Sequence, residues 1–222
     1  MKLVLSAALR RPLLGIALGT VLCASLQGCL PLVVGATAVG SMAAVDRRSL
    51  GMQTDDKTIE LKGEGRASKI TGDKGRVAVT SYNRMVVLSG EVADEKMKAE
   101  VQAQIATLGD LKKIENDLEV APVSTVSARS SDLLITSKVK AAIIDTKDLY
   151  ISAFKIHTDR GVVYLMGRVT QREAKLGAEV ARNAASDIRK VVKLFEYITE
   201  DELLEIKTKS SPEESRTPAP AK

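Results

Sequence analysis

The sequence contains few of the side chains on which catalysis and metal binding depend. Its 222 residues include two cysteines, one histidine and no tryptophan. Cys23 and Cys29 both lie near the N-terminus, so the rest of the chain can form neither a disulfide nor a thiolate metal site. His157 falls in a predicted strand, where we expect a structural role. The chain has no G-x-S-x-G sequence and no phosphate-binding glycine loop. We therefore expect no catalytic residues, no metal, no cofactor and no small-molecule substrate.

Aromatic residues are also scarce, at 3% of the chain. The core must then be built from Val, Ile, Leu and Ala, and the side chains that stack on nucleic-acid bases are missing. We expect no nucleic-acid partner. Charge is distributed unevenly: residues 55–120 contain 11 basic and 13 acidic side chains, whereas residues 128–198 contain 13 basic and eight acidic ones, a net charge of +5. A basic second half suits an anionic partner such as lipid headgroups, or simply a solubilising surface.

The N-terminal segment lacks charge between Arg11 and Asp46. A basic start is followed by an apolar stretch about as long as the hydrophobic region of a signal peptide. That stretch ends at Leu26-Gln27-Gly28-Cys29, which resembles the site cut by a lipoprotein signal peptidase. We predict a signal peptide over residues 1–28 and a lipidated, palmitate-bearing Cys29, followed by an apolar tether over residues 29–54.

The alternative is an uncleaved transmembrane helix, which the apolar length alone would allow. Pro12, Pro31 and several glycines weigh against a continuous helix. Leu30 follows the cysteine, where an Asp would favour the inner membrane. The predicted location is therefore the outer membrane, with the protein lipid-anchored and facing the periplasm.

An internal repeat organises the remainder of the chain. The segment 85–92 (MVVLSGEV) recurs at 162–169 (VVYLMGRV), which aligns Gly90 with Gly167. Each copy reads as helix, strand, turn, strand, helix, strand, and we expect the two glycines to be structural. The predicted fold class is α+β, with two tandem αββαβ domains at residues 55–120 and 132–199. A linker at 121–131 joins them and is short enough that the domains should touch, and a polar, disordered tail follows at 200–222, with a short helical turn at 199–207.

These repeats resemble the BON domain. The resemblance rests on the valine-rich second strand with its glycine, on segment 46–51 (DRRSLG) and on segment 163–175 (VYLMGRVTQREAK), and it extends to dual-BON outer-membrane lipoproteins. It implies that each domain is a three-stranded mixed sheet with two helices on one face. It also implies a protein that binds anionic phospholipid through the second domain, gathers at cell-division sites and supports outer-membrane integrity. Outer-membrane assembly proteins are its implied partners.

The first helix of the second repeat carries the candidate lipid site. With Asp132 as the predicted N-cap, Ile135, Val139, Ala142 and Ile143 form the stripe that should face the sheet. The site residues lie off that stripe: Leu133, Leu134, Ser137, Lys138, Lys140 and Ala141. Exposed leucines beside lysines suit a membrane interface. The resemblance implies a Trp in place of Leu134, and this chain departs from it there.

Two readings of that helix stay open. If Leu133 and Leu134 face solvent, a lipid contact is favoured; if they pack on the linker or the other domain, the protein is better described as a scaffold for envelope proteins. In the first repeat, Gly63 and Gly65 are expected to interrupt the matching helix. We therefore expect the first domain to act as a spacer or as a protein-contact module.

Overall fold

The computed structural model of the chain describes residues 46–210. The predicted signal peptide, Cys29, the tether up to residue 45 and the tail from residue 211 lie outside the described residues. Within 46–210, none of the helices combines the length and apolar character needed to cross a membrane.

The first domain has the predicted αββαβ order. Its elements are α2 (Leu50–Thr71), β1 (Arg76–Tyr82), β2 (Met85–Val92), α3 (Glu95–Ala106), β3 (Lys113–Asn116) and β4 (Glu119–Val120). β1 runs antiparallel to β2, and β3 and β4 both pair with β2 in parallel. The single closing strand that was predicted is thus split in two, where the Asn116 side chain accepts a hydrogen bond from the backbone N–H of Leu118.

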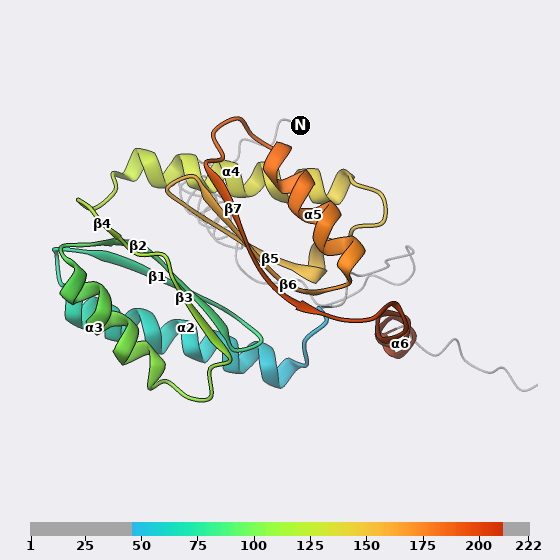
Figure 1. The fold of residues 1–222 in the computed structure, drawn as a ribbon, viewed down its shortest axis with the longest axis horizontal. Coiled ribbons are helices and arrows are strands. Elements are labelled where there is room, and N and C mark those ends of the chain that lie inside the picture. The colour runs from blue at the N-terminus through green and yellow to red at the C-terminus, as the bar shows by residue number, and fades with distance from the viewer. Residues whose placement is uncertain (1–45, 211–222) are drawn as a thin grey trace, which may run out of the picture. The chain divides into compact units, whose positions relative to one another are not determined.

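The second domain repeats this order with an unbroken closing strand. Its elements are α4 (Val126–Asp145), a short 3-10 turn η1 (Ile151–Ala153), β5 (Phe154–Asp159), β6 (Val162–Val169), α5 (Gln171–Asn183) and β7 (Lys190–Tyr197). β5 is antiparallel to β6, and β7 is parallel to it. In each domain the two helices cover one face of the sheet (Figure 1). The predicted α+β class and the mixed sheets are therefore confirmed.

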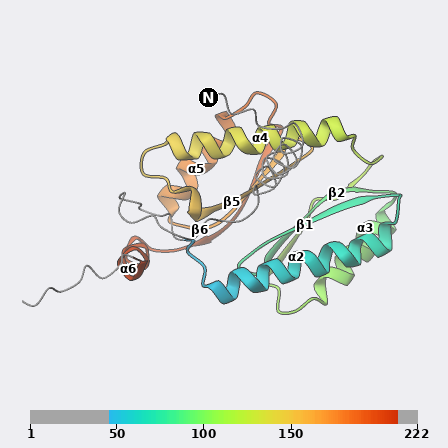
Figure 2. The ribbon, with the colours of Figure 1, turned by 180° about the vertical axis from the view of Figure 1, so that it is seen from behind.

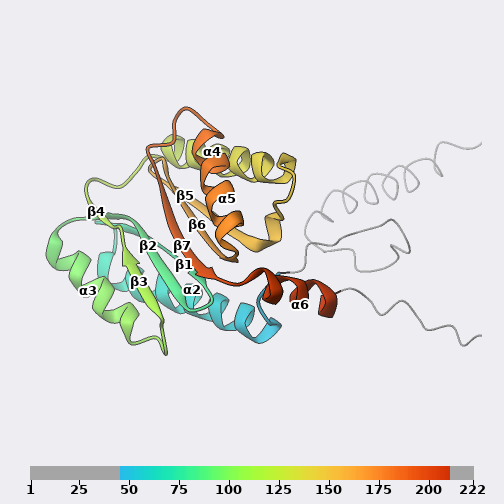
Figure 3. The same cartoon turned by 45° about the vertical axis from the view of Figure 1, so that its right-hand side comes forward.

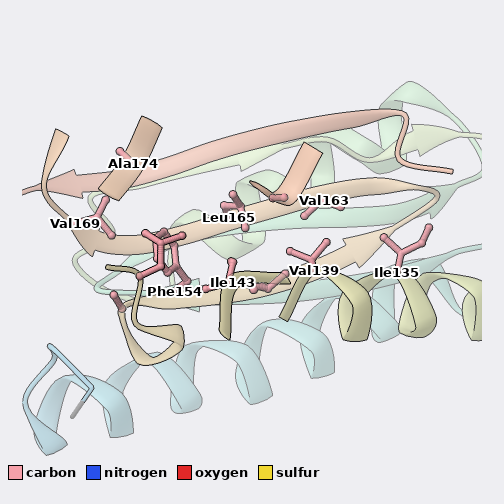
Figure 4. Close-up of a cluster of buried hydrophobic side chains, with 12 residues drawn as sticks. Ile135, Val139, Ile143, Phe154, Val163, Leu165, Val169 and Ala174 are labelled. Atoms are coloured by element: carbon pink, nitrogen blue, oxygen red, sulfur yellow. The ribbon is translucent and has the colours of Figure 1, made fainter. Parts of the chain in front are cut away.

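The core of each domain lies between its sheet and its helices. In the second domain, Ile135, Val139 and Ile143 of α4 point towards β5 and β6 and are almost fully buried (Figure 4). These are three of the four residues predicted to face the sheet, and the fourth, Ala142, is half-buried. The corresponding core of the first domain includes Ile59 and Ala67 of α2.

A buried aspartate in the first helix of each domain binds the hairpin turn of that domain. Asp56 accepts hydrogen bonds from the backbone N–H groups of Asn83 and Arg84, at 2.7 and 2.9 Å. Asp132 accepts those of Arg160 and Gly161, at 2.9 and 2.8 Å. All four turn residues have positive φ, so these tight turns depend on a partner that satisfies their N–H groups.

The prediction that Asp132 caps α4 is consequently wrong. The N-cap is Thr125, whose hydroxyl accepts a hydrogen bond from the backbone N–H of Ala128 at 3.2 Å. Helix α4 therefore begins at Val126, and the second half of the predicted linker is helical. The sequence pattern misled because Asp132 accepts hydrogen bonds from the N–H groups of a distant turn and not from those at the start of its own helix.

Helix α2 is continuous, which contradicts the expected interruption at Gly63 and Gly65. It also starts at Leu50, inside the predicted tether, with Ser49 as its N-cap. Gly63 lies where a Cβ atom would come within 2.9 Å of the Val79 side chain. The missing side chain thus lets α2 approach β1, and this packing offsets the low helix propensity of glycine.

The segment after β7 forms the helical turn predicted at 199–207, and the helix extends further than predicted. Helix α6 spans Glu200–Ser210, so the first eleven residues of the predicted disordered tail are helical. The Thr199 hydroxyl accepts a hydrogen bond from the backbone N–H of Glu202, and the Glu202 carboxylate accepts one from the N–H of Thr199. This reciprocal cap fixes the start of the helix. Leu203 of α6 is buried.

The two domains contact each other, as the short linker suggested. An apolar cluster joins β1 and β2 of the first domain to β6 and β7 of the second; it contains Tyr82, Met85, Val87, Val162, Tyr164, Met166 and Leu194. Since the helices cover the opposite faces of the two sheets, the sheets pack against each other with the helices outside (Figures 2 and 3). Charged pairs surround the cluster, including Arg76 with Asp159 at 2.8 Å.

Buried carboxylates and His157 should make stability fall in acid. Burial acts to raise the pKa of Glu91, but hydrogen bonds from Arg76 hold it below 4.5. The pKa of Glu173 is likewise lowered, because hydrogen bonds from Arg47 outweigh the effect of burial. Burial lowers the pKa of His157 below its usual 6.5. In every case the unfolded chain binds the proton more tightly, so the stabilisation is complete above the unfolded pKa and is lost as pH falls.

We expect the free energy of unfolding to decline in two steps, first below pH 6.5 and again below pH 4.5. Urea unfolding across a pH series would measure both. His157→Gln should remove the first step and keep the second. An identical decline between pH 6.5 and 5 in that variant would show that His157 is not its source.

Candidate functional site

The outer face of α4 exposes an unusual amount of apolar surface. Val126 is 70% exposed, Leu133 69%, Leu134 64% and Ile144 61%. Ala141 is also exposed. We refer to these five residues as the outer stripe. Both leucines are about two-thirds exposed, so neither is buried against the linker or the first domain.

The outer stripe runs the length of the helix. Val126 and Ile144 are about five turns apart and therefore point in the same direction, with Leu133, Leu134 and Ala141 between them. The core residues of α4 lie on the opposite side. An ordinary surface helix has one apolar face. α4 has two, of which the sheet covers only one.

Serine side chains on this face are already hydrogen-bonded to the helix itself. The Ser137 hydroxyl donates to the carbonyl of Leu133 at 2.9 Å, and that of Ser130 donates to the carbonyl of Val126 at 3.0 Å. A hydroxyl that keeps its hydrogen bond costs much less to remove from water. Ser130 and Ser137, which lie among the residues of the outer stripe, therefore oppose its burial only weakly.

Lysines flank the outer stripe on both sides. On a helical projection Lys138 lies beyond Leu134, and Lys140 lies beyond Leu133 on the other margin. Both are exposed. Within residues 46–210, no carboxylate comes within 4.0 Å of either ammonium group. By contrast, Arg160 and Arg168, at the domain interface, both pair with glutamates. The lysines of α4 are thus free for an external anion.

The matching surface of the first domain lacks this pattern. The positions that align with Leu133 and Leu134 are Lys57 and Thr58, and Lys57 pairs with Glu60 at 3.4 Å. Glu64 stands where α4 has Lys140. Two leucines on α2, Leu50 and Leu61, are exposed. The extended apolar face flanked by lysines is therefore a property of the second domain.

All six predicted site residues lie together on exposed α4: Leu133, Leu134, Ser137, Lys138, Lys140 and Ala141. The sequence interpretation missed Val126 and Ile144. Val126 was missed because the helix was started too late. Ile144 lies three residues after Ala141, on the same face of α4. Extending the predicted site by one helical turn would therefore have included it.

His157 takes part in the domain interface. Its Nε2 lies 3.0 Å from the Ser89 hydroxyl and 3.9 Å from Asp159, and its ring stacks on Tyr164. A catalytic triad needs the acid on the other ring nitrogen and an accessible hydroxyl, whereas Ser89 is buried. In the described part of the chain, no group of three or more His, Cys, Asp or Glu side chains could hold a metal.

This fold and its duplication define the class of protein. The BON domain family matches residues 54–122 and 131–199. The chain therefore belongs to the BON domain family and carries two copies of the domain.

Known relatives agree with this assignment. The chain is 34% identical over 175 residues to the outer membrane lipoprotein DolP of Haemophilus influenzae, covering 78% of this chain and 90% of that protein. It is 28% identical over 156 residues to a 21 kDa hemolysin of Actinobacillus pleuropneumoniae, covering 69% and 80%. A solved structure of CdsD, a type III secretion protein of Chlamydia trachomatis, covers 68% of this chain and 98% of its own, with 10% identity and a TM-score of 0.28, too low to support any argument.

Proposed function

We propose that this protein is a non-enzymatic, lipid-anchored protein of the outer membrane whose second BON domain binds anionic phospholipid through α4. The observation that carries the proposal is the outer stripe, an apolar helix face that is open to solvent and flanked by unpaired lysines. The similarity to an outer membrane lipoprotein supports the location. By stabilising this contact, the protein would support the integrity of the envelope.

The outer stripe would supply most of the binding free energy. Complete burial of an aliphatic side chain contributes about 1.5–3 kcal/mol, so four that are roughly two-thirds exposed could contribute about 4–8 kcal/mol. Each lysine near an anionic surface adds about 1 kcal/mol. Association of a free protein opposes this by several kcal/mol. The contact should therefore be weak for the detached protein and effective once an anchor raises its local concentration.

Co-sedimentation of residues 30–222 with phospholipid vesicles tests the proposal directly. We expect binding to vesicles that contain anionic lipid and much less binding to neutral ones. Binding to neither would favour a scaffold that contacts envelope proteins, and equal binding to both would contradict a preference for anionic phospholipid.

Lys138→Ala should weaken vesicle binding mainly at low salt. The lysine contributes through electrostatics, which salt screens over a Debye length of about 10 Å at 0.1 M, whereas apolar burial hardly responds to moderate salt. Titration with vesicles at two ionic strengths would measure the difference. The matched control is Lys62→Ala, at the equivalent position of α2, and it should leave binding unchanged. A loss that is independent of salt would argue against a headgroup contact for Lys138.

Membrane attachment should depend on Cys29. Cys29→Ser should abolish metabolic palmitate labelling and move the protein from the membrane fraction to the soluble fraction, because the sulfur is the proposed site of lipidation. Fractionation with an alkaline wash provides the measurement. A Cys29→Ser protein that remains in the washed membrane would instead support an uncleaved transmembrane helix.

A further inference from the structure

Arg47 precedes the first domain in the sequence, yet its side chain binds the second domain. The guanidinium of Arg47 donates to both carboxylate oxygens of Glu173 at 2.7 Å and to the carbonyl of Arg168 at 2.8 Å. Side-chain exposure is 4% for Arg47 and 1% for Glu173. A buried pair with two parallel hydrogen bonds has a strict geometry, so this contact fixes where the chain enters the fold.

Arg48, the next residue, binds the first domain. It donates to Asp56 at 2.7 Å, and its guanidinium lies over the Tyr82 ring, 4.2 Å from the centroid. Asp56 is the carboxylate that binds the first hairpin turn, and Tyr82 belongs to the apolar cluster between the domains. Two successive side chains therefore hold opposite sides of the domain interface.

Glu173 also caps the start of its own helix, α5. Its carboxylate accepts a hydrogen bond from the backbone N–H of Thr170, whose hydroxyl accepts the N–H of Glu173, a capping box at the start of α5. The carboxylate is thus held in position by its own helix before Arg47 reaches it. A preorganised partner of this kind makes a buried ion pair less costly to form.

We infer that Arg47 and Arg48 form a bridge that keeps the two BON domains closed on each other. This arginine bridge belongs to the segment that directly precedes α2. The linker after β4 joins the domains covalently, and the apolar cluster with its charged pairs holds their sheets together. The arginine bridge adds a contact to both domains from the residues that precede α2. Closure in turn fixes α4 on one side of the pair and α2 and α3 on the other. The inference does not depend on what α4 binds.

Distance measurements between two spin labels test the arginine bridge. The labels would sit on exposed positions of opposite layers, through Glu64→Cys on α2 and Ser137→Cys on α4, in residues 29–222 with Cys29→Ser so that no other thiol is present. We expect one narrow distance distribution for the otherwise unchanged protein. The double variant Arg47→Gln/Glu173→Gln should show a second, longer distance, with the open population raised about tenfold or more.

The double variant is chosen to keep the second domain folded. Glutamine can replace glutamate in a capping box, and removing both charges leaves no buried charge without a partner. Arg172→Gln is the matched control, because it breaks an exposed pair with Glu200 at the same end of α5; it should leave the distance unchanged. Arg47→Lys keeps the charge without the paired hydrogen bonds and should open the domains partially. An unaltered narrow distribution in both Arg47 variants, or an open population in the parent protein, would overturn the inference.

Discussion

Replacing Gly167 with valine should lower the free energy of unfolding by about 3 kcal/mol, the upper part of the usual range for forcing atoms into a packed site. A Cβ atom at this position would lie 2.4 Å from the carbonyl oxygen of Ala153, which belongs to the backbone and cannot move aside cheaply. Gly90→Val should cost more. The contact there would be 2.0 Å from the Arg76 carbonyl oxygen, and the φ of Gly90 is +121°, which a branched residue rarely adopts.

Thermal and urea unfolding would measure both losses, and Gly65→Ala is the control. Nothing lies within 4 Å of a Cβ atom at Gly65, which is exposed on α2. An alanine there should raise stability by about 0.5–1 kcal/mol through helix propensity. If Gly167→Val melted at the temperature of the unchanged protein, the glycine that the repeat preserves would not be a fold-defining position.

The repeat could be read from the sequence because local patterns carry it. Strand alternation, the glycine that ends the second strand and the capping box at Thr170 each depend on neighbouring residues. These features predicted the α+β class and the order of elements in both domains correctly. The positions of Leu133 and Leu134 away from the core were also predictable, because helical spacing sets the face of a residue wherever the helix begins.

The errors arose where a side chain serves a partner far along the chain. Asp132 resembles an N-cap by its place before an apolar run, yet its carboxylate binds a turn 28 residues later. Gly63 looks like a break in a helix, but it is the place where α2 approaches Val79. No local pattern could have paired Arg47 with Glu173, which are 126 residues apart. Such contacts depend on tertiary packing.

Leu134→Glu should abolish vesicle binding at every salt concentration while leaving the fold intact. Leu134 is 64% exposed, so the change removes apolar surface and adds a negative charge beside Lys138 without disturbing the core. The carboxylate would be repelled by an anionic surface and would be costly to move towards the acyl chains. Because the outer stripe supplies the larger share of the proposed binding free energy, no reduction in salt should restore the contact.

Leu61→Glu is the matched substitution. Leu61 is 60% exposed on α2, the equivalent helix of the first domain, so the chemical change and the exposure are nearly the same. The two variants should have the same circular dichroism and melting temperature as the unchanged protein. Any difference between them in binding can then be assigned to the position of the leucine.

Titration of these two variants with vesicles containing anionic phospholipid is the most direct test of α4 as a membrane contact. The account predicts that Leu61→Glu binds as the unchanged protein does and that Leu134→Glu does not bind. Undiminished binding by a folded Leu134→Glu protein would contradict it, because the outer stripe would then not be the surface that meets the membrane.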